Sequence, residues 1–195
     1  MYFKKLVIAA ILMSTGLVAQ EQTLLGRGMD HGVYGSWGLQ VSQVNGQTAY
    51  LSTSQLVWLI NHRYSLGLGG YNLVASVEGP QSLDAGNRFI DLDMGGVEMG
   101  YIFGPNKLIH GAFRVLASVG QVSYHYKDLD SSWKGEENFI TSISPSVDFM
   151  MNVTSFLHLS ITARYRLVNG VDLDGLTDAD LSGPSVGAGI QIGKF

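Results

Sequence analysis

Residues 156–167 read Phe-Leu-His-Leu-Ser-Ile-Thr-Ala-Arg-Tyr-Arg-Leu, an alternation of apolar and polar side chains. Because successive side chains of a β-strand point to opposite faces, this period of two predicts a strand and not a helix. One face carries Leu157, Leu159, Ile161, Ala163, Tyr165 and Leu167, and the other carries His158, Ser160, Thr162, Arg164 and Arg166. A soluble sandwich buries such an apolar face, whereas a transmembrane barrel turns it toward lipid. The rest of the chain decides between these architectures.

The N-terminus has the pattern of a secretory signal peptide. Two lysines and an apolar run over residues 6–18 lead to Ala19, after which the sequence becomes polar. The run is shorter than the about 20 residues that a membrane-spanning helix needs. We therefore expect residues 1–19 to be removed during export and residues 20–195 to form one domain.

The composition differs from that of most soluble domains. Charged residues make up 14% of the chain and hydrophobic residues 46%, whereas soluble domains contain about 25% charged residues. The net charge of −4 comes without a basic cluster, which argues against nucleic acid as a partner. The chain has no cysteine, so disulfides, thiol chemistry and a lipidated N-terminal cysteine are excluded. We expect no cofactor.

Eight segments have the pattern and length of strands. They cover residues 33–44, 48–60, 64–77, 88–103, 108–126, 138–153, 156–168 and 181–195. Tight turns at 61–63, 104–107 and 154–155 alternate with long polar loops at 78–87, 127–137 and 169–180. Outer-membrane barrels have short periplasmic turns and longer outer loops. The sequence therefore predicts an all-β fold, an eight-stranded antiparallel up-and-down transmembrane β-barrel with both termini in the periplasm.

The fourth segment contains a predicted change of phase. Before the pair Gly95-Gly96, Asp91 and Asp93 share the polar face and would point inward. After the pair, the polar Glu98 has the opposite parity. A double glycine is a common place for a β-bulge, so we expect a bulge there.

Other positions predict local features of the strands. Asn45-Gly46 is a strong signal for a tight hairpin. The glycines within residues 67–70 predict a second phase change, and Pro145 predicts a bulge or a weakly paired position. The final Phe195, an aromatic end typical of outer-membrane barrels, has the parity opposite to the apolar face of its strand. Either a bulge near Gly193 restores the phase or the terminal signal is degenerate.

The predicted inward faces supply the candidate site. They carry Asp91, Asp93, Glu98, His110, Arg114, Asp148, His158, Arg164 and Arg166. An eight-stranded barrel is narrow enough for side chains to fill its lumen, and the guanidinium of arginine binds carboxylates bidentately. We therefore expect a closed network of salt bridges and hydrogen bonds. A small-solute pore is the weaker alternative.

Two motifs suggest further chemistry. His158-Leu159-Ser160 is similar to the His-x-Ser pair of outer-membrane lipid A deacylases, and a histidine can activate a serine on the same strand face. Both residues share the lumen face, however, and the polar motif that flanks the pair in that family is missing. We prefer the interpretation that they belong to the lumen network and keep a lipid-modifying enzyme as the alternative.

The predicted loop 169–180 contains several carboxylates, which are Asp172, Asp174, Asp178 and Asp180. Such a group could hold Ca²⁺. The spacing departs from that of an EF-hand, and no glutamate closes the loop. We therefore prefer a solvated loop that meets divalent cations bound to lipopolysaccharide.

Several motifs together resemble a known family. They are Gly26-Arg-Gly-Met-Asp30-His31-Gly32, Val44-Asn45-Gly46-Gln47, Trp58-Leu-Ile60-Asn61-His62 and Leu68-Gly69-Gly70-Tyr71. These motifs resemble those of small uncharacterised outer-membrane β-barrel proteins of Bacteroidota and related Gram-negative bacteria, most strongly over residues 24–73. The resemblance implies a barrel in the outer membrane, and it implies no particular activity.

The leading hypothesis is a structural or interaction role through the extracellular loops. The expected partners are outer-membrane lipid and lipopolysaccharide, together with the barrel-assembly machinery, which would meet the C-terminal strand.

Overall fold

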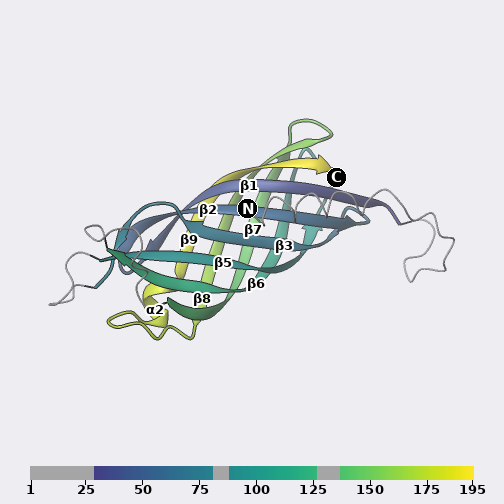
Figure 1. Cartoon of the computed structure of the whole chain (residues 1–195). Helices are drawn as coiled ribbons and strands as arrows, with labels where there is room; N and C mark the ends of the chain where they lie inside the picture. The colour runs from purple at the N-terminus through teal and green to yellow at the C-terminus, as the bar shows by residue number, and fades with distance from the viewer. Residues whose placement is uncertain (1–28, 81–87, 127–136) are drawn as a thin grey trace, which may run out of the picture.

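The computed structural model describes residues 29–80, 88–126 and 137–195, and antiparallel strands dominate it (Figure 1). The elements are β1 (His31–Val44), β2 (Gln47–Ile60), β3 (Tyr64–Leu73), β4 (Val77–Glu78), β5 (Arg88–Phe103), β6 (Ile109–Tyr126), β7 (Glu137–Asn152), β8 (Leu157–Asn169), the helical turn α2 (Asp178–Leu181) and β9 (Gly183–Lys194). The predicted signal peptide, loop 127–136 and residues 81–87 lie outside the described residues.

The sheet closes on itself. Each long strand pairs with its neighbours in sequence, β9 pairs with β1, and the short β4 follows β3 along the edge of β5. The result is a closed barrel of eight antiparallel strands, as the sequence predicts. Among the described residues, no helix is both long and apolar enough to cross a membrane.

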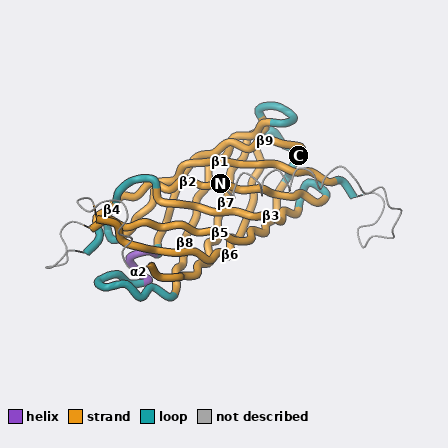
Figure 2. Tube along the Cα trace, viewed as in Figure 1, coloured by secondary structure: helices purple, strands orange, loops and turns teal. Residues whose placement is uncertain are grey.

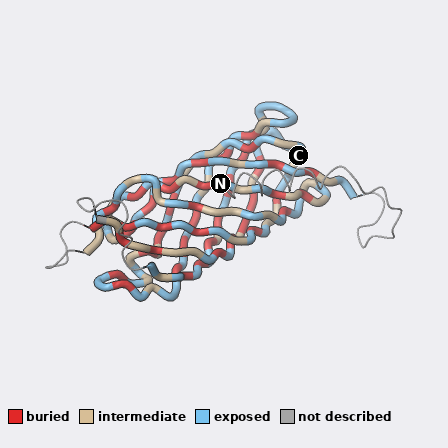
Figure 3. Tube along the Cα trace, viewed as in Figure 1, coloured by how far each residue is buried: buried red, intermediate tan, exposed pale blue. Residues whose placement is uncertain are grey.

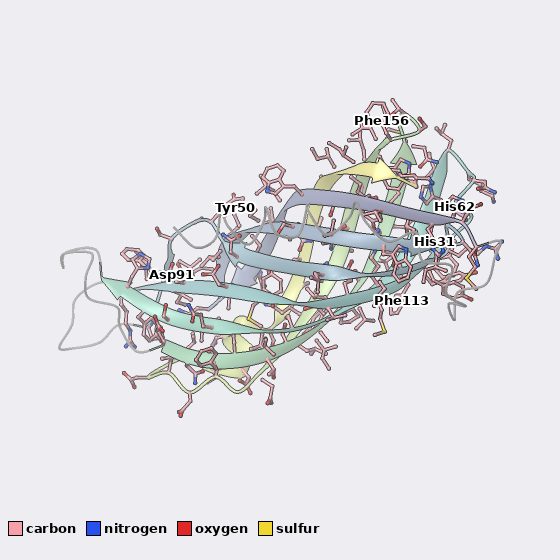
Figure 4. The ribbon with its side chains drawn as sticks, turned by 45° about the vertical axis from the view of Figure 1, so that its right-hand side comes forward. His31, Tyr50, His62, Asp91, Phe113 and Phe156 are labelled. Atoms are coloured by element: carbon pink, nitrogen blue, oxygen red, sulfur yellow. The ribbon has the colours of Figure 1, made fainter. Side chains whose placement is uncertain are left out.

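The two ends of the barrel differ in their connections (Figure 2). The turn end carries the short turns 61–63, 104–108 and 153–156, with His31, His62 and Phe156 (Figure 4). The loop end carries the connection between β8 and β9, and Asp91 lies near this end (Figure 4). The hairpin between β1 and β2 is also at the loop end, where Asn45 and Gly46 have φ angles of 49° and 69°. These positive angles confirm the predicted tight Asn-Gly turn.

Every long strand keeps one parity from end to end, and buried residues stay on the inward positions throughout (Figure 3). The β5–β6 ladder runs from Arg88 opposite Tyr126 to Phe103 opposite Gly111 in one register, so the bulge predicted at Gly95-Gly96 is wrong. The phase change predicted within residues 67–70 is also wrong, because the β2–β3 ladder is continuous. A one-residue shift would turn every later side chain to the opposite face, and the packed interior prevents it.

Pro145 interrupts a ladder without shifting its register. On β7 and β8, Ile143 pairs with Leu167 and Ser146 pairs with Arg164, while Pro145 has no partner on β8. The register is the same on both sides of this gap. Because proline has no N–H to donate, Pro145 is the weakly paired position that the sequence allows as one of two outcomes.

The outside of the barrel is largely apolar. Exposed side chains from all the long strands form this outer face, and they include Leu39, Leu56, Leu68, Phe113, Phe149, Ile161 and Ile192. Close to the turn end, the ring of Tyr101 lies 5.3 Å from that of Tyr64 and 5.0 Å from that of Phe103. Tyr50 and Phe113 also lie on this outer face (Figure 4).

Candidate functional site

A cluster of ion pairs occupies the middle of the lumen. Arg114 of β6 lies between two carboxylates, with Nη1 3.6 Å from Glu98 Oε1 and Nε 3.3 Å from Asp148 Oδ2. Arg164 of β8 places Nη2 3.3 Å from the other oxygen of Glu98. All four side chains are almost completely buried. Two cations and two anions balance one another, and this balance offsets the cost of removing charges from water.

Neutral polar groups complete this lumen ion cluster. Gln55 donates from Nε2 to Glu98 Oε2 over 2.9 Å, and its Oε1 accepts from Ser36 Oγ and from Arg114 Nη1. Thr162 donates to Asp148. A cavity of about 20 Å³ beside Gln55 and the two arginines has room for about one water molecule. The middle of the lumen is therefore filled by side chains.

The loop-end half of the lumen is mainly apolar. Buried side chains from several strands, including Leu51, Tyr71, Leu92, Leu116, Val122 and Ile140, pack into one cluster. The connection between β8 and β9 folds over this cluster and adds Leu173, Leu176 and Leu181 to it. We call residues 170–182 the loop-end plug, since they close the barrel at this end.

Two buried arginines hold the loop-end plug. Arg88 donates to the carbonyls of Pro80 and Asp174, and its guanidinium carbon lies 4.3 Å from the centre of the Tyr124 ring. Arg166 donates to the carbonyl of Leu181 over 2.6 Å. Arg166 also donates to the carbonyl of Gln43 near the end of β1, so it connects the plug with the barrel wall.

An aromatic group closes the lumen at the turn end. The ring of Phe195 stacks on His158 at 3.5 Å and on Tyr34 at 5.1 Å between centroids. Tyr34 belongs to a buried apolar cluster with Leu59, Ile102 and others, and Phe195 packs against that cluster. Strand β9 has no bulge in either of its ladders. The terminal aromatic thus faces the lumen, and the bulge considered near Gly193 is absent from β9.

The proposed His158 and Ser160 pair does not form a nucleophile and its base. Ser160 Oγ donates to the carbonyl of Gly189 at 3.4 Å, while His158 stacks on Phe195 and meets the ring of His110 edge to face. Both residues are described, and no hydrogen bond joins them. Each is also buried inside the barrel, away from the lipid-facing surface. This arrangement lacks the contact that would activate a serine.

The carboxylates of the loop-end plug have separate roles. Asp178 Oδ1 accepts from the backbone of Val171, and Asp180 Oδ2 accepts from both the backbone and the hydroxyl of Thr177. Asp174 lies 3.6 Å from Arg88, and Asp172 is exposed. Within the described ranges, no three His, Cys, Asp or Glu side chains are placed to hold a metal ion. Asp178 and Asp180 instead order the helical turn α2.

The predicted lumen residues divide into three groups. The structure places Glu98, Arg114, Asp148 and Arg164 together in the lumen ion cluster, and it places His110, His158 and Arg166 elsewhere inside the barrel. Asp91 and Asp93 are exposed on the outer face, so the prediction that they line the lumen is wrong. With no bulge in β5, they share the parity of Val97 and Met99, and Asp91 pairs with His125 at 2.9 Å on the outside.

Sequence reasoning missed several residues of the site. Gln55 lies in a strand with apolar residues on both faces, so its alternation alone does not assign a direction. Arg88 is the first residue of the predicted segment 88–103, but the sequence pattern around it does not predict a contact with the loop-end plug. The parity of Phe195 was the signal that could have revealed its inward position.

Comparison with known proteins supports the fold. No protein-family model matches the chain, and no curated protein matches it. Among solved structures, neisserial surface protein A is similar with a TM-score of 0.56 and 16% identity over 87% of this chain and 100% of that one. The attachment invasion locus protein Ail of Yersinia pestis has a TM-score of 0.51 and 12% identity over 86% of this chain and 99% of that one. Both are small outer-membrane eight-stranded β-barrel proteins.

Proposed function

We propose that this protein is an integral outer-membrane β-barrel that is closed to solutes and acts through contacts at its loop end. The main support is that the inner and outer faces of the barrel wall differ in polarity at mid-height. There the lumen ion cluster fills the inside while apolar side chains cover the outside. An apolar belt around a polar interior is the arrangement of transmembrane barrels. The fold shared with neisserial surface protein A and Ail supports the same location.

The charge of the loop end favours a particular class of partner. Its described residues expose Glu78, Asp91, Asp93, Asp172 and Asp174, with no exposed lysine or arginine among them. Ail has been crystallised with sucrose octasulfate, a polyanionic heparin analogue. The acidic loop end of this chain favours instead a cationic partner, or divalent cations that bridge to lipopolysaccharide.

We also propose that β9 is the strand that meets the barrel-assembly machinery. Its outward residues Val186, Ile190 and Ile192 are exposed and apolar. Phe195, in contrast, packs inside the folded barrel. Recognition of the folded strand would therefore depend on these aliphatic residues.

Surface labelling tests the location and the orientation together. Since the chain has no cysteine, Asp174→Cys and Asn106→Cys place single thiols at the loop end and the turn end. On intact cells, a membrane-impermeant maleimide should label Asp174→Cys and not Asn106→Cys. Labelling of both or neither, or a protein that migrates the same on gels with and without boiling, would contradict the proposal.

Conductance separates a closed barrel from a pore. Purified protein in a planar bilayer should give no steady ion current, because the lumen ion cluster and both end closures occupy the interior. A reproducible single-channel conductance would support the pore alternative. A change in the lipid A mass spectrum that depends on Ser160 would support the enzyme alternative.

A further inference from the structure

The outer face contains an apolar groove bounded by two rows of side chains. The first row follows the pairing register from Trp37 through Ile190, Leu159 and Met151 to Ile109. The second row runs beside it through Leu39, Ala188, Ile161 and Phe149. Met150, Ser160 and Gly189 are the inward-facing positions of the wall between the two rows and line the floor of the groove, whose open volume is about 640 Å³. We call this feature the wall groove.

The wall groove has the dimensions of one acyl chain. It crosses from β1 to β6 over four strand spacings, which makes it about 19 Å long at about 4.8 Å per spacing. One leaflet of a bilayer is about 15 Å deep, half of the hydrocarbon core of about 30 Å. The small side chain of Ala188 leaves a gap between Leu39 and Ile161, whose side chains are 47% and 60% exposed. A single extended chain therefore fits between the rows.

Charge marks one end of the wall groove. Lys107 is exposed and lies two residues before Ile109, where the first row ends at the turn end. Its backbone is held in place, because its carbonyl accepts from Asn152 Nδ2 over 3.2 Å and its N–H donates to the carbonyl of Gly104 over 2.9 Å. The side-chain carbons of Lys107 lie beside Gly104 in this ordered turn, so its ammonium group is the candidate contact for a phosphate next to the end of the groove.

The distribution of charge over the whole barrel agrees with this placement. In the part of the chain that the structure describes, the exposed basic residues Arg63, Lys107 and Lys194 all lie at the turn end. The exposed acids lie mainly at the loop end. A leaflet with anionic headgroups is therefore favoured at the turn end and disfavoured at the loop end.

We infer that the wall groove binds one acyl chain of an anionic glycerophospholipid, whose phosphate contacts Lys107. The inference rests on the membrane location proposed above and adds a defined lipid site to it. It makes the barrel selective among the lipids of one leaflet, through a contact that involves neither the lumen nor the loops.

Quenching of Trp37 by brominated lipids tests this site. The chain has three tryptophans, so Trp58→Phe combined with Trp133→Phe leaves only Trp37, on the rim of the wall groove. The full chain is refolded into phosphatidylcholine vesicles in which the fraction of brominated phosphatidylglycerol, or of brominated phosphatidylcholine, is raised stepwise. We expect the anionic lipid to reach half-maximal quenching at an about fivefold lower fraction, because a lysine at an anionic surface contributes about 1 kcal/mol.

Two matched variants assign the preference to the groove. Lys107→Gln should remove the fivefold preference, whereas Arg63→Gln removes the same charge from a turn between β2 and β3, outside the groove, and should retain it. Equal quenching by the two lipids, or a preference that survives Lys107→Gln, overturns the inference. Absence of quenching by either lipid together with cross-linked dimers would show that a second copy fills the groove, and this also overturns it.

Heat-modifiable migration of each variant identifies the source of a failure. A folded, inserted barrel without lipid preference contradicts the lipid site alone. A protein that fails to insert into any vesicle contradicts the membrane location as well.

Discussion

The two halves of β5 have the same backbone parity and opposite chemistry. Toward the loop end, Leu92 points inward into the apolar cluster and Asp91 points outward. Toward the turn end, Glu98 points inward into the lumen ion cluster and Val97 points outward. The first half is patterned like a soluble barrel and the second like a transmembrane barrel. This difference indicates that the environment of the outer face changes from one half of β5 to the other.

The loop-end half is consistent with a wall that projects beyond the bilayer on β3, β5 and β6. Several outward positions there are polar, among them Asn72, Asp93 and Ser123. Water surrounds a wall that projects beyond the bilayer, so this half of the barrel needs an apolar core inside the lumen for its stability. The loop-end plug supplies the cap of that core.

The strongest test of the comparison removes a charge from the turn-end half. Arg114→Ala leaves Glu98 and Asp148 without their shared cation, and it should lower the free energy of unfolding by about 3–5 kcal/mol. Urea titration in lipid vesicles, followed by tryptophan fluorescence, measures this change. The exposed Arg63→Ala is the control, with an expected change within about 0.5 kcal/mol. A similar small change for Arg114→Ala would mean that the lumen ion cluster does not stabilise the barrel.

The next test removes an apolar side chain from the loop-end half. Leu92→Ala should cost about 3 kcal/mol of unfolding free energy, because it leaves a cavity in a packed core. The neighbouring Asp91→Ala should cost less than about 1 kcal/mol, since its pairing with His125 is exposed. A large loss of unfolding free energy for Asp91→Ala and a small loss for Leu92→Ala in the same titration would show that the assigned inward face of β5 is wrong.

A charge placed on the outer face distinguishes lipid from water along the same strand. Val97→Arg should destabilise the inserted barrel by about 2 kcal/mol, because its side chain faces the apolar belt. Asp93→Arg has the same parity nearer the loop end and should change the stability by less than about 1 kcal/mol. Unfolding of both variants in the same vesicles gives the comparison, and equal effects would place both positions in one environment.

The smallest expected effect concerns the loop-end plug. Arg88→Met keeps much of the buried volume but loses the hydrogen bonds to the carbonyls of Pro80 and Asp174, at a cost of about 1–2 kcal/mol. We expect protease to cleave within residues 170–182 several times faster, while the strands stay protected. A cleavage rate equal to that of the unchanged protein would show that Arg88 does not hold the plug.

Alternation and turn signals predicted much of the fold. The ends of β5 and the Asn45-Gly46 hairpin agree with their sequence patterns, because strand period and turn geometry are local properties. The inward placement of Arg114 and Arg164 also follows from period two. Period two did not identify the inward face near Leu92, because apolar side chains face inward in the loop-end half of β5 and outward in its turn-end half.

The sequence by itself determined how many long strands form and where they turn. Only the closed barrel decided which face is inside at each height, which carboxylate meets which arginine, and that Phe195 and residues 170–182 close the two ends. The physical reason is that a strand's period depends on its own backbone, whereas burial and ion pairing depend on side chains that strands distant in sequence bring to the same level of the lumen.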